Sequence, residues 1–295
     1  MKSNLDSFFN MPPEPTAFVE LCAGTAAVSF ALMGYEGYHY PPYMGAKYRW
    51  APYILSLMDV KHSTNIHLND IGPWSIVWQT LKDPINRSVV SQSLRESYNL
   101  LGNEDDPNRL YRDMLATKLI PYDPVLFTST FIHLQWANYM GIPVTIKDHQ
   151  WKISAFNNIG FTRKLGIFAG QRSSLGRIAE RIDRMSILDL HSITVSNLSA
   201  EEIIPIPGSI CYIDPPYAST AGYHKQDLTR DQVISIALSW SQSGASVYIS
   251  EAEPILLLIN QGWQSVDITD HTRGSSNNMR QKKRREYLTY YKHPS

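Results

Sequence analysis

The sequence predicts an α/β protein built on a seven-stranded, mostly parallel sheet, with an inserted, mainly helical domain. Strand-like apolar runs alternate with helical patterns in residues 1–83 and again in residues 187–295, an order that gives a parallel sheet. The first strand leads through a small-residue turn into a helix, as in nucleotide-binding βα units. Residues 84–186 lack this alternation and have mostly helical patterns, so we assign them to the inserted domain.

The composition is that of a globular chain without an overall charge. Of the 295 residues 43% are apolar, which is enough to bury a core, and 27 basic residues balance 27 acidic ones. Binding of nucleic acid would therefore depend on local basic patches. The N-terminus has no apolar signal segment, and no apolar run approaches the ~20 residues of a membrane span. We expect a cytoplasmic protein that does not contact a membrane.

The cysteines and histidines form no recognisable metal site. Cys22 and Cys211 lie in apolar, strand-like runs, and buried free thiols of this kind are typical of a reducing cytoplasm. The nine histidines follow no ligand spacing. We therefore expect no metal cofactor.

The first two strands end in polar residues that could bind a nucleotide-like ligand. Residues 17–22 form the first predicted strand, and Glu20 near its end could face a ligand amine. The turn at residues 23–26 has small side chains, which let a ligand approach the backbone. Asp70 follows the second strand, where an acidic residue usually binds ribose hydroxyls, although Asn69 and Asp70 could equally cap the next helix.

A turn leading into an amphipathic helix is predicted for residues 40–58. Lys47 stands just before the helix, close to Gly45. It is either part of a ligand site or a solvated lysine in a connector, and the sequence leaves both interpretations open.

The strongest motif is Asp214-Pro215-Pro216-Tyr217, which ends the apolar strand at residues 210–213. The prolines cannot donate to a sheet ladder, so they stop the strand and hold the motif in a stiff turn at its carboxyl end. The Asp214 carboxylate and the Pro215 carbonyl could accept the two hydrogens of a nucleobase amine and localise its lone pair. Tyr217 could stack on the base and align it with a methyl donor. The alternative is an ordinary proline turn with a surface tyrosine.

Two basic segments could contact nucleic-acid phosphates. Arg177, Arg181 and Arg184 are spaced i, i+4 and i+7 on a predicted helix, so they share one face. A loop rich in Gly, Ser and Asn carries six Lys and Arg residues between Arg273 and Arg285. Its predicted phosphate-binding residues are Arg273, Arg280, Lys282, Lys283 and Arg284. Both segments could instead be solvated surface.

Together these motifs resemble the Dam-like (D12 class) DNA adenine-N6 methyltransferases, which use S-adenosylmethionine (SAM). FVELCAGTAAVSF is similar to their cofactor motif, and YMGAKYRWAPYI is similar to their G-x-K segment. IHLNDIGPWSIVWQTL resembles the strand whose acid follows the cofactor motif, and VSNLSAEE takes the place of the strand before DPPY. RREYLTYY is similar to their closing R…E-L-L-I segment, and the resemblance covers about two-thirds of the chain.

The resemblance implies a Rossmann-like SAM-dependent methyltransferase domain at 1–83 and 187–295 and a target-recognition domain at 84–186. The implied reaction is methyl transfer to adenine N6 of a base flipped out of double-stranded DNA. The implied catalytic residues are Asp214, Pro215, Pro216 and Tyr217. The implied SAM-binding residues are Glu20, Cys22, Ala23, Gly24, Ala26, Tyr43, Met44, Gly45, Lys47, Asp70 and Asn197. Such an enzyme could act beside a cognate restriction enzyme, or it could act in the context of a phage and its host.

The chain departs from the family pattern in three respects. Cys22 replaces the aromatic residue and Ala26 the second glycine of the cofactor motif. The G-x-K segment follows that motif instead of preceding it. Asn197 stands where the family usually has an aspartate for the adenine amino group of SAM, and its side-chain oxygen could accept the same bond.

Other functions stay open from the sequence. Cytosine-N4 methylation involves an amine with the same two hydrogens. Methylation of RNA or of a glutamine amide is a further alternative, although NPPY is more typical of those enzymes than DPPY. A DNA-binding relative without catalytic activity would keep the same fold.

Overall fold

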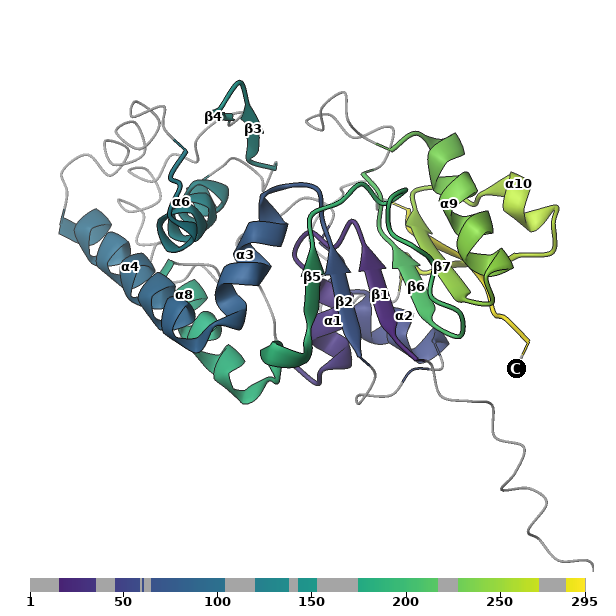
Figure 1. Cartoon of the computed structure of the whole chain (residues 1–295), viewed down its shortest axis with the longest axis horizontal. Helices are drawn as coiled ribbons and strands as arrows, with labels where there is room; N and C mark the ends of the chain where they lie inside the picture. Colours follow the sequence, from purple (N-terminus) through teal and green to yellow (C-terminus); the bar gives the residue numbers. More distant parts are fainter. Residues whose placement is uncertain are drawn as a thin grey trace, which may run out of the picture.

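The structure is a computed structural model that describes residues 16–35, 46–58, 60, 65–103, 120–137, 143–152, 175–216, 228–270 and 285–294. A seven-stranded sheet has the order β5-β2-β1-β6-β7-β9-β8. Its strands are β1 (Phe18–Leu21), β2 (Ile66–Asn69), β5 (Thr194–Ser196), β6 (Ile210–Ile213), β7 (Ser246–Glu251), β8 (Gln264–Asp267) and β9 (Tyr287–Tyr291). Neighbours pair in parallel from β5 to β7, and β9 is antiparallel to both β7 and β8. The predicted α/β class with a seven-stranded, mostly parallel sheet is confirmed (Figure 1).

The centre of the sheet lies between β1 and β6, where the order of the strands reverses. From β1 the chain proceeds outward through β2 to β5, and from β6 it proceeds outward in the other direction to β7. Open α/β sheets bind ligands at the carboxyl ends of the strands beside such a reversal. Leu21 pairs with Ile213, so the segments that begin at Cys22 and Asp214 leave the sheet side by side.

Helices cover both faces of the sheet (Figure 1). The central strands β1 and β6 are accordingly buried at every residue. The helices are α1 (Ala27–Leu32), α2 (Ala51–Leu57) and α3 (Pro73–Lys82) on one face, and α9 (Arg230–Gln242) and α10 (Leu256–Ile259) on the other. Phe18 of β1 belongs to the hydrophobic cluster of the first face, and Val19 and Leu21 belong to that of the second. Burial on both faces explains the continuous apolar run of β6 and the mainly apolar sequence of β1, in which Glu20 is the one charged residue.

A helical block extends the sheet on the side of α3 (Figure 1). It comprises α4 (Pro84–Asn103), α6 (Pro124–Ala137), a hairpin of β3 (Thr145–Lys147) and β4 (Gln150–Lys152), and α8 (Leu175–Arg184), with 3-10 turns η3 (Met185–Ile187) and η4 (Leu190–Ser192). Its helices α4 and α6 pack on α3, and α8 packs along α4. Val90, Phe131 and Ile178 belong to the same hydrophobic cluster as Phe18 of β1. The described parts of residues 84–186 are therefore mainly helical and share a continuous core with the sheet, and their assignment as a target-recognition domain stays a prediction.

Candidate active site

The loop after β1 contains three residues with left-handed backbone conformations, and two of these three are not glycine. Cys22, Gly24 and Ala26 have φ angles of 59°, 47° and 52°. For a residue other than glycine, this region costs about 1–2 kcal/mol. Neighbouring side chains hold the loop: Trp78 Nε1 donates to the Gly24 carbonyl at 2.8 Å, and Asp70 Oδ2 accepts the Gly24 N–H at 2.8 Å. These two bonds hold the loop in which Cys22 and Ala26 adopt left-handed conformations.

Asp70 joins this loop to the start of α3. Its Oδ2 accepts the Gly24 N–H at 2.8 Å, and its Oδ1 accepts the Gly72 N–H at 2.7 Å. Burial raises the pKa of the Asp70 carboxyl, and the two N–H donors oppose this by favouring the ionised form. The N-cap of α3 is Gly72, so Asn69 and Asp70 do not cap this helix themselves; Asp70 instead binds the N–H of the N-cap residue. Each carboxylate oxygen has a second lone pair, so Asp70 can also accept donors from a ligand.

Asn197 and two exposed apolar side chains surround Asp70 at the ends of β2 and β5. Asn197 Nδ2 donates to the Asp70 carbonyl at 2.9 Å and to Ser75 Oγ at 2.6 Å. Its Oδ1 is therefore the atom with which Asn197 would accept an amino hydrogen. Ile71 is 61% exposed and Leu198 43% exposed, and neither was predicted as a site residue. The available signal was an apolar residue directly after each polar residue at a strand end, where it could cover the face of a planar ring.

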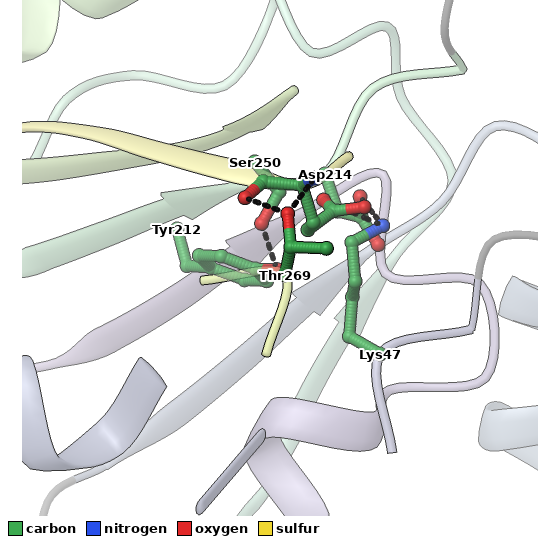
Figure 2. A network of polar contacts seen from close by, with 6 residues as sticks. Lys47, Tyr212, Asp214, Ser250 and Thr269 are labelled. Carbon is green, nitrogen blue, oxygen red and sulfur yellow. Dashed lines mark hydrogen bonds and ion pairs between the residues drawn. The ribbon is translucent and has the colours of Figure 1, made fainter. Parts of the chain in front are cut away.

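Lys47 lies beside Asp214 (Figure 2). Its Nζ is 2.6 Å from Asp214 Oδ1 and 3.7 Å from Glu286 Oε1. Its backbone carbonyl accepts the N–H groups of Trp50 and Ala51 at 2.9 and 2.8 Å, which fixes Lys47 at the start of α2. The side chain is only 3% exposed, so the interpretation of Lys47 as a solvated connector residue is wrong. Glu286 was not predicted, although the closing segment compared with the family contains it.

The Asp214 carboxylate is held by charge and by a rigid surrounding. Burial raises the pKa of its carboxyl, and the Lys47 ammonium lowers it again through charge attraction and a hydrogen bond. In the same network, Tyr212 Oη and Ser250 Oγ form a hydrogen bond of 2.7 Å between β6 and β7 (Figure 2). Pro215 is buried and Pro216 partly buried. Asp214 is therefore an acceptor with a fixed orientation at the carboxyl ends of the parallel strands, where such sheets bind ligands.

Two further carboxyl groups interact electrostatically with Asp214. Glu20 is 2% exposed, and its Oε2 accepts the N–H of Ser29 at 2.9 Å and the Ser29 hydroxyl. Burial raises the pKa of Glu20 to about 8 against the Ser29 hydrogen bonds, and the Asp214 charge adds to the rise. Burial raises the pKa of Glu251, at the end of β7, to about 7 against the attraction of Arg230. Glu20 thus contacts the start of α1, and its predicted contact with a ligand amine stays a prediction.

The arginines predicted to share a face of α8 lie away from Asp214. The Arg181 carbonyl accepts the Tyr35 hydroxyl at 2.9 Å, and the charges of Arg181 and Arg184 act on Tyr35. Tyr35 follows the end of α1 that is opposite to the loop after β1, so this part of α8 lies toward the amino ends of the parallel strands (Figure 1). Contact of Arg177, Arg181 and Arg184 with phosphates stays a prediction.

Several predicted site residues lie outside the described residues. They are Tyr43, Met44 and Gly45 of the cofactor set, Tyr217 of the catalytic set, and Arg273, Arg280, Lys282, Lys283 and Arg284 of the basic loop. Ala23 is described; it belongs to the loop after β1, and its side chain is buried in the hydrophobic core.

Comparison with known proteins assigns no family to the chain. No protein-family model matches it, and a search of curated proteins found no match. Within the described ranges, no three His, Cys, Asp or Glu residues gather in a way that could hold a metal ion. None of the helices in those ranges is long and apolar enough to cross a membrane. Any functional proposal must therefore rest on the motifs and on the geometry that joins them.

Replacing Asp70 by Asn should lower the free energy of unfolding by about 1–3 kcal/mol, the usual cost of an unpaired buried donor. Asn accepts only through its oxygen, so its amide nitrogen would face the N–H of either Gly24 or Gly72. Urea denaturation near neutral pH measures the loss. Asp83→Asn is the matched control, because Asp83 accepts the Asn86 N–H at an exposed helix start, where Asn caps as well as Asp. Equal losses in both variants would contradict the role of Asp70.

Replacing Glu20 by Gln should change how stability depends on pH. The carboxyl has a pKa of about 8 in the folded chain and an ordinary value of 4.5, so the folded state retains its proton while the unfolded state releases it between these pH values. Wild-type stability from this group is therefore complete below pH 4.5 and is lost as the pH rises to about 8. Glutamine does not titrate, so the stability of Glu20→Gln relative to wild type should rise by up to about 1.4 kcal/mol per pH unit.

Denaturant unfolding of both proteins at several pH values between 5 and about 8.5 would measure this difference. A stability difference that stays constant with pH would show that Glu20 is already ionised in the folded chain.

Proposed function

We propose that this protein is a SAM-dependent methyltransferase that acts on adenine N6 in double-stranded DNA. The proposal is carried by the 2.6 Å contact between Lys47 and Asp214, because it joins the G-x-K and DPPY motifs across 167 positions of the sequence. The sheet gives further support. The sheet has the seven strands that the resemblance implied, and the segment compared with the family's closing motif forms β9, which pairs antiparallel with β7 and β8.

The residues around the ends of β1, β2 and β5 fit SAM. The small residues at 23–26 allow close approach to the backbone, and the Asp70 carboxylate can accept ribose hydroxyls. Ile71 and Leu198 offer apolar surface to an adenine ring, and Asn197 Oδ1 offers an acceptor to its amino group. When bound, SAM would supply an activated methyl group on a sulfonium, which departs as a neutral thioether.

The residues around the end of β6 fit a nucleobase amine. The Asp214 carboxylate and the Pro215 carbonyl accept the two amine hydrogens, which directs the nitrogen lone pair toward the methyl group. Tyr217 stacks on the base, and this contact offsets part of the few kcal/mol needed to flip the base out of the duplex. Lys47 fixes the orientation of Asp214. As positive charge develops on the amine nitrogen, its bond to the Asp214 carboxylate strengthens, so this group acts chiefly on the transition state.

Asp214→Ala should abolish methylation while SAM still binds and the fold persists. The expected loss is at least a hundredfold in turnover, or ~3 kcal/mol, the scale for removing a group that stabilises developing charge. Single-turnover methylation of duplex DNA measures the chemical step, and calorimetry measures SAM binding. Glu253→Gln is a matched control, because Glu253 is a carboxylate shortly after the end of β7 and its side chain is 80% exposed. A turnover of Asp214→Ala close to wild type would refute the proposed role.

The identity of the product distinguishes the proposal from its rivals. Mass spectrometry of digested DNA should detect N6-methyladenine. Detection of N4-methylcytosine would favour the cytosine alternative. SAM binding without any modified base, on DNA, RNA or protein, would favour a catalytically silent relative.

Neutralising the basic loop should weaken DNA binding to all sequences alike. Replacement of Arg280, Lys282, Lys283 and Arg284 by Gln should reduce the slope of log affinity against log salt by roughly 0.9 for each lost phosphate contact. Fluorescence anisotropy with a labelled duplex at several salt concentrations measures this slope. The same replacements of Arg177, Arg181 and Arg184 test the phosphate-binding hypothesis for α8 separately. An unchanged slope in the loop variant would identify the loop as solvated surface.

A further inference from the structure

The Lys47 ammonium lies between two carboxylates that come from distant parts of the chain. Asp214 Oδ1 is 2.6 Å from Lys47 Nζ, and Glu286 Oε1 is 3.7 Å from it. The side chains of Lys47 and Glu286 are 3% and 4% exposed, and that of Asp214 is 19% exposed. Asp214 is thus the member of this trio that is most accessible to a ligand.

Glu286 is itself fixed by the end of β8. Its N–H donates to Thr269 Oγ1 at 2.9 Å, and the Thr269 hydroxyl donates to its carbonyl at 3.4 Å. The same carbonyl accepts the Ile268 N–H at 2.8 Å. Figure 2 shows Thr269 in the same polar network as Lys47 and Asp214. The Glu286 carboxylate is therefore presented to Lys47 from a rigid backbone position.

We propose that Glu286 is a positioning residue that shares the Lys47 ammonium with Asp214 and so keeps the Asp214 carboxylate effective as an acceptor for the substrate amine. This inference rests on the proposed function, which makes Asp214 the acceptor. A lysine ammonium has three donors, so it can bind both carboxylates. If Lys47 were paired with Asp214 alone, its positive charge would oppose the charge that develops on the amine in the transition state. The negative charge of Glu286 offsets that opposition.

Other titratable groups also act on this site and need to stay unchanged in a test. Glu20 on β1, Tyr212 on β6 and Glu251 on β7 each interact electrostatically with Asp214, as does Cys22 in the loop after β1. A substitution confined to Glu286 leaves all four in place. Glu286→Gln is suitable because it removes the charge and keeps the shape of the side chain.

The kinetic test compares Glu286→Gln with wild type in the full-length protein. Turnover of duplex DNA should fall at least tenfold, while the KM for SAM stays within about twofold, because the lost effect is specific to the transition state. The exposed variant Glu253→Gln should match wild type. Turnover of Glu286→Gln within about twofold of wild type would overturn the proposal.

A second measurement does not depend on activity. Carboxyl-carbon NMR of aspartate-labelled protein, with the Asp214 signal assigned through Asp214→Asn, follows the titration of Asp214. In Glu286→Gln the pKa of Asp214 should fall, because a negative charge beside the Lys47 ammonium is lost and Asp214 then interacts with a less neutralised positive charge. An unmoved titration would overturn the proposal even if turnover fell. If the wild type showed no methylation, the proposed function would fail, while this titration would still decide whether Glu286 controls the charge on Asp214.

A pair of substitutions at Thr269 provides the test if Glu286→Gln does not fold. Thr269→Val removes the hydroxyl that binds both backbone groups of Glu286, and Thr269→Ser retains it. Thr269→Val should shift the Asp214 titration and turnover in the same directions as Glu286→Gln, to a smaller extent. Thr269→Ser should restore both to wild-type values. Identical behaviour of the two Thr269 variants would contradict the positioning role.

Discussion

The ion pair between Lys47 and Asp214 is the constraint on which the candidate site depends. An ammonium that is 3% exposed would cost several kcal/mol without a carboxylate partner. The segment before α2 must therefore bring Lys47 to the end of β6. The Lys47 carbonyl meanwhile accepts the first N–H groups of α2, so one residue fixes both the start of this helix and the orientation of Asp214. The pair thus couples the packing of α2 to the geometry of the acceptor.

Two aspartates, at the ends of β2 and β6 on either side of β1, are stabilised in different ways, and this divides the carboxyl-end side of the sheet into two halves. Asp70 is held by the backbone N–H groups of Gly24 and Gly72, which are dipoles. Asp214 is held by a full positive charge. Under the proposed function, the first half, at β1, β2 and β5, binds the cofactor through the Asp70 carboxylate, the Asn197 amide and apolar side chains. The second half, at β6, β7 and β9, contains the ionic network that acts on the substrate amine.

The sequence predicted the strands of the sheet well because their burial leaves a local signal. The run at 210–213 is apolar without interruption, and Pro215 and Pro216 mark where it stops. Thr229 and Gln232 begin α9 with a capping box, and Gly244 follows its end with a φ of 95°. Contacts between distant segments leave no such signal. The contact of Glu286 with Lys47 depends on how β9 enters the sheet, and the periodicity of α8 shows that its arginines share a face without showing what that face meets.

The loop after β1 adopts left-handed turns at residues other than glycine. Ala26 replaces a glycine of the family pattern, yet it has a φ of 52° and is fully buried, so its methyl group lies in the core. Cys22 has a φ of 59° and packs partly on the opposite hydrophobic cluster. Each left-handed residue costs about 1–2 kcal/mol. Two hydrogen bonds at Gly24 oppose this cost: Trp78 Nε1 donates to the Gly24 carbonyl, and the Gly24 N–H donates to Asp70 Oδ2. The side chains of Ala26 and Cys22 thus face the interior, while the backbone of this loop has left-handed turns.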